Sequence, residues 1–208
     1  MLPLRKDIRY VEADGKLTQA GVEAIQGQID AGSTTAAGLN TRLTAVETEL
    51  AGSLINLQTA QTASSNTEFN FTGIPTWVNR VTVVGRGLST NGTSNYTLRI
   101  GDGAIVTTGY LGATTTIAGA TPTTANPTTG VTLNQSTTAA SVFGFEATIS
   151  RLSGNSWQIS GLGSLSNTNT LSMFASGLTL SGALDRVRLT TVAGTDTFDA
   201  GDINISWE

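Results

Sequence analysis

A seven-residue repeat of apolar positions occupies the N-terminal part of the chain. With Val22 as position a, one register holds to residue 60, and large aliphatic residues fill eight of its twelve a and d positions: Val22, Ile25, Ile29, Leu39, Leu43, Val46, Leu50 and Leu57. A seam that keeps its register for so long, with polar residues beside it, is typical of a coiled coil. We therefore predict an interrupted coiled coil over residues 22–62, with these eight side chains as its trimerisation contacts.

Small residues interrupt this repeat between Gly32 and Gly38. Glycine is a poor helix former, so we expect a short helix near 21–31 and a longer one near 37–63. The early seam has β-branched residues at both a and d, which favours more than two strands, and we predict a trimer. The alternative is a pair of helices packed on their own β-domain, but the seam is narrow and its flanks are polar.

Alternation of apolar and polar residues replaces the repeat from about residue 67 onward. The clearest runs of period two are 96–100, 143–149, 187–190 and 203–207, and turn sequences rich in Gly and Asn lie between them. Eight to ten strands at this spacing predict a mainly β fold over 67–208, an antiparallel β-sandwich or jelly roll. Residues 114–138 have few apolar side chains to bury, and we expect them to form a long surface excursion.

Composition excludes several classes of function. The 208 residues contain no His and no Cys, and Lys6 and Lys16 are the only lysines. Histidine-based or cysteine-based catalysis, the usual zinc sites, disulfides and a phosphate-binding lysine loop are therefore excluded. We expect no catalytic residue, no metal and no cofactor. A net charge of −4 argues against nucleic-acid binding.

The N-terminal residues 1–21 hold a cluster of basic side chains, including Arg5, Lys6 and Arg9. This segment has the character of an attachment peptide. The apolar run of a secretory signal does not follow it, and no stretch approaches 18 apolar residues, so synthesis in a cytoplasm without membrane insertion is expected.

The C-terminal zone resembles the β-domains of tailed-bacteriophage fibres and other virion surface proteins. The resemblance rests on the sequences at 68–83, 89–96, 101–103, 181–191 and 194–205, and the short Asp-Gly-Lys-Leu-Thr piece at 14–18 is similar to one that such proteins carry ahead of a helix. It implies a homotrimeric structural protein of the virion, anchored by its N-terminus and projecting a β-rich head. It carries over no catalytic residue.

These observations lead to one hypothesis and three alternatives. We expect a tail fibre that binds itself as a homotrimer, binds other virion proteins through residues 1–21, and attaches to a host-surface glycan. Three copies would make weak contacts effectively intramolecular. A capsid fibre or decoration protein, a polysaccharide-degrading spike, and a bacterial sugar-binding module remain open.

Candidate ligand contacts in the β-zone are few. Tyr110 and Trp157 are the aromatic residues that we predict to contact a glycan, because a ring face packs on the apolar side of a sugar. Asp196, Asp199 and Asp202 offer oxygen ligands for a cation, but they lack the pattern of a known calcium loop, and whether they bind one stays open. A polysaccharide-degrading spike would need two carboxylates, for which Asp102 and Glu146 are examples.

Overall fold

The structure is a computed structural model that describes residues 19–53, 55–135 and 137–208. The chain divides into two compact units, Met1–Ser53 and Leu54–Glu208, and each is described by itself. Within the first unit, side chains are described for residues 22–45. The predicted attachment peptide and the side chains of Val46 and Leu50 therefore lie outside the described residues.

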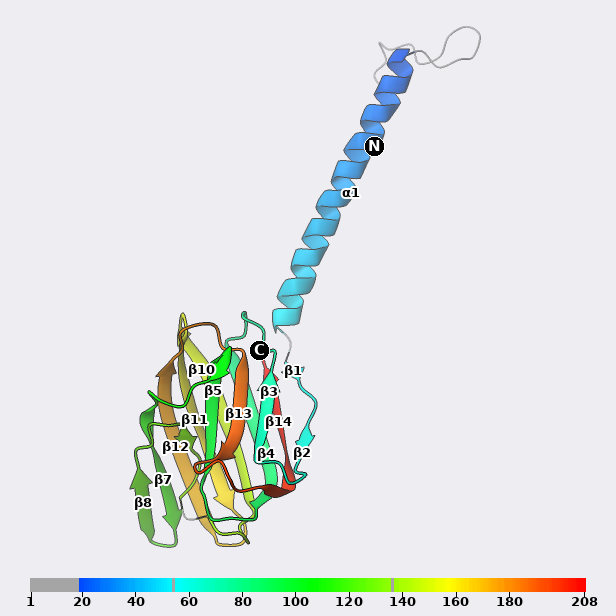
Figure 1. Cartoon of the computed structure of the whole chain (residues 1–208). Helices are drawn as coiled ribbons and strands as arrows, with labels where there is room; N and C mark the ends of the chain where they lie inside the picture. Colours follow the sequence, from blue (N-terminus) through cyan, green and yellow to red (C-terminus); the bar gives the residue numbers. More distant parts are fainter. Residues whose placement is uncertain (1–18, 54, 136) are drawn as a thin grey trace. The chain divides into compact units, whose positions relative to one another are not determined.

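One helix, α1 (Gln19–Ser53), runs through the first unit without a break (Figure 1). The interruption expected between Gly32 and Gly38 is therefore wrong. The hydroxyls of Thr34 and Thr35 donate to carbonyl oxygens four residues earlier, each over 2.9 Å, so both threonines are satisfied inside the helix. Each glycine lowers helix stability by about 1 kcal/mol, which weakens the helix but does not end it.

The helix ends at Ser53, earlier than expected, and strands follow it. Leu57, predicted as a seam contact, lies in strand β1 (Asn56–Leu57), where it is the partner of Ser206. A helix that reaches residue 62 is therefore wrong. Backbone pairing with the far end of the sequence takes this segment out of the helix, although Leu57 keeps the heptad phase.

The second unit is built from antiparallel strands only, so the predicted mainly β fold after an N-terminal helix is confirmed. A larger sheet has the order β1-β14-β4-β10-β11-β12-β7-β8, with β2 also paired to β14, and a smaller sheet has the order β3-β13-β5-β6, with β9 also paired to β5. The strands after β1 are β2 (Gln61–Thr62), β3 (Glu68–Thr72), β4 (Arg80–Thr90), β5 (Tyr96–Asp102), β6 (Ala104–Ile105), β7 (Leu111–Ala118), β8 (Thr121–Ala125), β9 (Val131–Thr132), β10 (Phe143–Ser153), β11 (Ser156–Leu165), β12 (Thr170–Thr179), β13 (Arg186–Thr191) and β14 (Phe198–Trp207).

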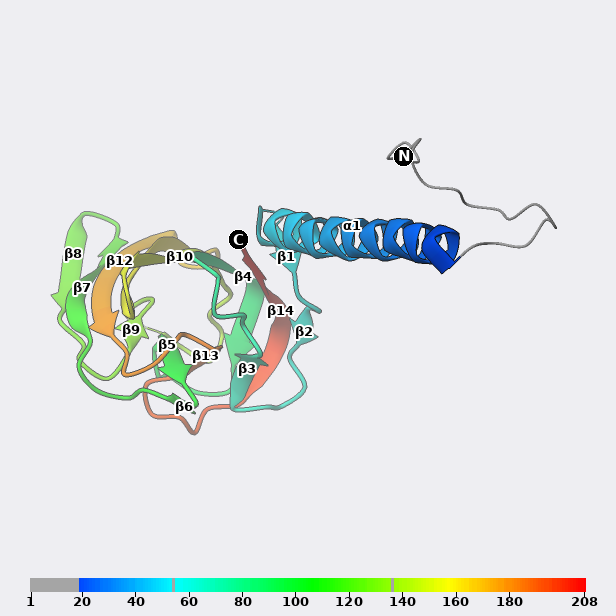
Figure 2. The same cartoon turned by 90° about the horizontal axis from the view of Figure 1, so that it is seen from above.

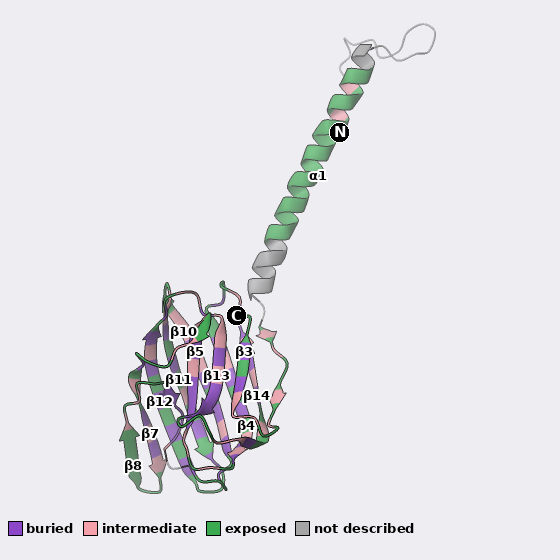
Figure 3. Ribbon diagram, viewed as in Figure 1, coloured by how far each residue is buried: buried purple, intermediate pink, exposed green. Residues whose placement is uncertain are grey.

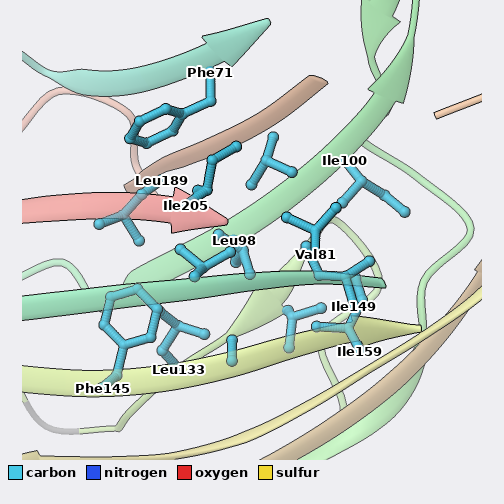
Figure 4. Packing of buried hydrophobic residues seen from close by; sticks show 14 of the residues in the cluster. Phe71, Val81, Leu98, Ile100, Leu133, Phe145, Ile149, Ile159, Leu189 and Ile205 are labelled. Carbon is cyan, nitrogen blue, oxygen red and sulfur yellow. The ribbon is translucent and has the colours of Figure 1, made fainter. Parts of the chain in front are cut away.

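Both sheets contribute to one hydrophobic core. The larger sheet curves around the smaller one (Figure 2), and alternate residues of β10 and β11 are buried on its inner side. Side chains such as Phe145 and Ile149 there share a cluster with Leu98 and Leu189 of the smaller sheet (Figure 4). Strand β5 is buried along nearly its whole length, because it lies inside the unit (Figure 3).

The β-unit has two distinct ends, which we name the base and the tip. The base is the end where Asn56 of β1 pairs with Trp207 of β14. The tip is the opposite end, where Phe198 begins β14 and is the partner of Thr90 at the end of β4. The loops β4–β5, β9–β10, β11–β12 and β13–β14 all lie at the tip (Figure 1).

The chain enters the β-unit at the base and runs along β14 toward the tip. Backbone hydrogen bonds join this segment to β14 from Gln58, which donates to Ile205, to Ser65, which donates to Phe198. Strands β1 and β2 lie between these points. The first and last segments of the β-unit are therefore paired over its whole length.

The surface excursion expected over 114–138 is confirmed for 118–129, where every residue is exposed or half-buried, but it is wrong for both ends of the segment. Strands β7, β8 and β9 lie in this segment, and Val131 and Leu133 are fully buried. Thr114 and Thr116 are buried too, because their hydroxyls find partners: Thr114 bonds the carbonyl oxygen of Thr132, and Thr116 bonds Ser172. Threonine therefore replaces larger apolar residues in this part of the core.

Candidate functional site

Tyr110 lies inside the β-unit, which contradicts the exposed position expected of a glycan contact. Its side chain is fully buried, and its hydroxyl accepts a hydrogen bond from the backbone N–H of Ile100 over 2.8 Å. The same hydroxyl lies 3.2 Å from the carbonyl oxygen of Val106, to which it donates. Burial raises the pKa of Tyr110 to about 12. The ring presents no face to a sugar.

The hydrogen bonds of the Tyr110 hydroxyl explain why this side chain is buried. Strand β5 pairs with β9 at Thr97 and Leu98 and with β6 from Gly101 onward, so its edge has no strand partner between them. The hydroxyl of Tyr110 occupies this gap and satisfies Ile100 in place of a strand. Tyr110 is therefore a structural residue of the smaller sheet.

Trp157 is buried as well and does not offer an exposed ring for stacking. The guanidinium carbon of Arg151, its partner on β10, lies 4.9 Å from the ring centroid, a cation–π contact. Within the described residues the indole Nε1 has no hydrogen-bond partner. Trp157 nevertheless lines a cleft.

This basal cleft, of about 690 Å³, lies at the base of the larger sheet, where β11 begins and β12 ends. Trp157 is a buried part of its lining, whereas Leu111 and Leu152 are 79% and 81% exposed. None of the lining residues is charged. The hydroxyls of Ser156 and Thr179 bond one another over 2.9 Å. The cleft thus suits a neutral, mainly apolar partner.

Hydrogen bonds of side chains join the tip loops to one another. In the β4–β5 loop, Asn91 accepts from the backbone N–H of Thr197 over 2.9 Å, and the backbone N–H of Ser94 donates to Asp196 over 2.8 Å. Both bonds reach the β13–β14 loop. The hydroxyl of Ser94 also accepts from the N–H of Ala193 over 2.9 Å. These two loops are therefore fixed in one arrangement.

The β9–β10 loop continues this network. Asn95 accepts from the backbone N–H of Thr137 over 3.2 Å, and buried Asn134 accepts from the N–H of Tyr96 over 3.0 Å. Asn167 of the β11–β12 loop accepts from the N–H of Val142 over 3.3 Å. Four loops thus form one connected, mostly neutral polar surface. The sequence marked these segments only as turns, since the bonds join residues far apart in the chain.

The three aspartates left open as cation ligands have different surroundings. Asp196 belongs to the tip network, whereas Asp202 accepts from the hydroxyl of Thr62 over 2.6 Å. Asp199 is exposed. Among the described residues, no group of three or more potential ligands is placed to hold a metal.

The carboxylates considered for polysaccharide cleavage lie apart. Glu146 is on the outer face of the larger sheet, opposite Val84 and Leu162. Asp102 accepts from the hydroxyl of Ser181 over 2.6 Å and from the backbone of Gly182, and these bonds hold the pKa of Asp102 below its usual value. A general acid for glycoside hydrolysis needs the opposite shift.

The helix carries the other candidate site. The seam residues whose side chains are described are all exposed, at 40–59%: Val22, Ile25, Ile29, Leu39 and Leu43. Figure 3 shows this exposure along the helix. These large aliphatic side chains share one face of the helix, with Gly32 and Ala36 between the two groups, and such an exposed apolar face is typical of an interaction surface.

A comparison with known protein families finds no match, and a search of curated proteins finds none. In the described part of the chain, no helix is long and apolar enough to cross a membrane. The function is therefore inferred from the chain's own geometry.

Proposed function

We propose that this protein is a non-enzymatic homotrimeric fibre of a tailed-bacteriophage particle. Residues 1–21 attach it to other virion proteins, α1 assembles three copies as a coiled coil, and the β-unit is a sandwich head. In this proposal the tip faces the host and binds a surface glycan.

The exposed seam of α1 carries the proposal. The helix has 35 residues and contains Gly27, Gly32 and Gly38, each of which lowers its stability. Most helices in proteins depend on packing of an apolar face. The described seam side chains are at least 40% exposed, so that packing has to come from another helix. Identical seams supply it in a coiled coil, and β-branched residues at a and d favour three strands.

The tip supports the attachment role. Its loops are held by hydrogen bonds before any ligand arrives, which lowers the entropy lost on binding. Many of its exposed residues, among them Asn91, Thr93, Thr138 and Thr195, are neutral and polar. Such groups match the hydroxyls of an uncharged sugar. Tethering three tips makes successive weak contacts intramolecular.

Light scattering after size-exclusion chromatography tests the assembly. The chain has a mass of 21.4 kDa, so a trimer has about three times that mass. Leu43→Asp would bury charges in the seam, and we expect monomers. Thr41→Asp is the matched control, because position 41 falls on the heptad position farthest from the seam. A monomeric native protein, or a trimer that survives Leu43→Asp unchanged, would overturn the coiled coil.

Imaging of particles tests the location. A label on the C-terminus should appear at the tail tip or baseplate. Label spread over the shell would instead indicate a capsid fibre or decoration protein. No label on any particle would reject both virion roles and leave a cellular sugar-binding module as the function to test.

A further inference from the structure

The base of the β-unit holds its most exposed apolar side chains. Four large hydrophobic residues are at least 70% exposed: Ile55 at 70%, Leu57 at 72%, Leu111 at 79% and Leu152 at 81%. Ile55 and Leu57 flank Asn56, which defines the base. Leu111 begins β7 beside the end of β12, and Leu152 is near the end of β10. Their concentration at one end indicates an interface.

These side chains form two separate groups. Ile55 directly precedes β1 and Leu57 ends it, at one edge of the larger sheet, whereas Leu111 and Leu152 line the basal cleft beside β11 and β12. Four strand spacings separate β1 from β11, roughly 19 Å along the sheet at about 4.8 Å per spacing. The β1 segment therefore does not fill the cleft of its own chain.

We infer that the basal cleft is a socket for the segment Ile55–Leu57 of a neighbouring copy of this chain. The inference rests on the proposed homotrimer and names a contact within it. A projecting group at one edge of the sheet and a receiving group at a different place on the base make a heterologous interface, and such interfaces can close into rings by rotation. Each copy would donate one β1 segment and receive one.

The chemistry of the two groups is complementary. The lining of the cleft is uncharged and includes buried Trp157, Leu178 and Leu180. The incoming Ile55 and Leu57 supply apolar side chains, and their burial in such a cleft removes apolar surface from water. The segments that line it carry few charges, because residues 103–145 and 152–184 contain no Asp, Glu, Lys or Arg. Interface centres show this depletion of charge. The charged groups that contact the lining are both partnered: Arg151 lies over the ring of Trp157, and Asp102 accepts from Ser181.

The segment Ile55–Leu57, which would enter the socket, lies close to the seam in sequence. Positions 54 and 55 alone separate the end of α1 from β1. Copies joined through their helices must therefore hold their β1 segments near one another, at a high effective concentration. Leu57 keeps the phase of the helical seam, and in this arrangement it continues the assembly as a strand residue.

Cysteine cross-linking of the full-length protein tests the socket, because the chain has no cysteine of its own. A double variant, Leu57→Cys with Leu152→Cys, is treated with a short bismaleimide and run on a denaturing gel. We expect covalent dimers and trimers. Leu57→Cys alone and Leu152→Cys alone should stay monomeric on the gel. The pair Leu57→Cys with Val192→Cys is the matched control, since Val192 is an exposed residue of the tip loop β13–β14.

The outcomes separate the socket from the proposed function. Dimers from Leu57→Cys alone would show that β1 segments meet one another, and the socket would be wrong. A native trimer without cross-links in the Leu57/Leu152 pair would also reject the socket and leave the coiled coil standing. A monomeric native protein would reject both. Leu111→Glu in the double-cysteine background should lower the cross-linked fraction at least fivefold.

Discussion

The replacement Tyr110→Phe separates a structural role for this residue from a role in ligand binding. It removes one oxygen atom and keeps the ring. In the native protein that oxygen accepts the backbone N–H of Ile100 over 2.8 Å, in a strand that is buried nearly throughout. Phenylalanine would leave this N–H buried without a partner.

The structure sets the size of the effect. A buried donor without an acceptor costs about 1–3 kcal/mol. The carbonyl oxygen of Ile100 keeps a second partner, the N–H of Val106 at 3.0 Å, whereas the carbonyl oxygen of half-buried Val106 loses a donor 3.2 Å away. The N–H of Ile100 is therefore the fully buried group that is left without a partner. For a unit of this size, about 2–4 °C in Tm corresponds to 1 kcal/mol, and we expect a loss of about 3–9 °C.

Tyr96→Phe is the matched control. Tyr96 is equally buried, but its hydroxyl donates to the carbonyl oxygen of Leu88 over a longer 3.3 Å. We expect a smaller loss, below about 1 kcal/mol. Both variants are compared by thermal and urea unfolding at pH 7, followed by near-UV circular dichroism. A Tm change below about 1 °C for Tyr110→Phe, or a larger one for Tyr96→Phe, would refute the role assigned to the Tyr110 hydroxyl.

Four further predictions concern charge, packing and helix propensity. Burial raises the pKa of Tyr96 and Tyr110 to about 12. The free energy of unfolding should therefore be unaffected by these groups below about pH 10 and fall by roughly 3 kcal/mol per tyrosine toward pH 12. Absorbance at 295 nm should show both side chains ionising above the usual pKa of tyrosine, and ionisation at the usual pKa would contradict this. The pKa of Asp102 is lowered, so the stability that its carboxylate contributes is lost as pH falls below the usual carboxyl range. In urea unfolding, Asp102→Asn should therefore lose less stability on acidification than the native protein does. A Cβ at Gly112 would lie 2.1 Å from a backbone oxygen of β12, so Gly112→Ala should cost at least about 2 kcal/mol. Gly38→Ala, with nothing within 4 Å, should add about 1 kcal/mol to helix stability.

Local patterns were sufficient for β5, β10, β13 and β14, whose residues alternate clearly, and for the existence of a helix. The alternation at 143–149 predicted β10, because inward Phe145 and Ile149 occupy every second position. The heptad pattern predicted α1, but it could not show where the helix ends. Leu57 has a heptad position and a strand position at once, and its pairing with Ser206 depends on residues 149 positions away.

The errors in the β-zone have the same cause. Tyr110 lies in a glycine-rich segment that reads as a loop, and its burial depends on an unpaired edge of β5. Thr114 and Thr116 are buried only because Thr132 and Ser172 accept or donate across strands. The tip network likewise joins asparagines to backbone groups of other loops. Whether such residues are buried depends on partners that are distant in sequence, and the periodicity of apolar residues does not reveal those partners.

The pairing of the first segment of the β-unit with its last strand has a mechanical consequence. In the proposed fibre, a head whose tip is bound to the host and which is pulled through position 55 would be loaded along the axis of this segment, away from the tip. The hydrogen bonds between it and β14, from Gln58 to Ser65, lie across that axis and share the load in shear. These hydrogen bonds must break together, whereas in an unzipping geometry they would break one after another. In the proposed fibre, the β-unit would thus be pulled in the direction in which a paired strand resists force best.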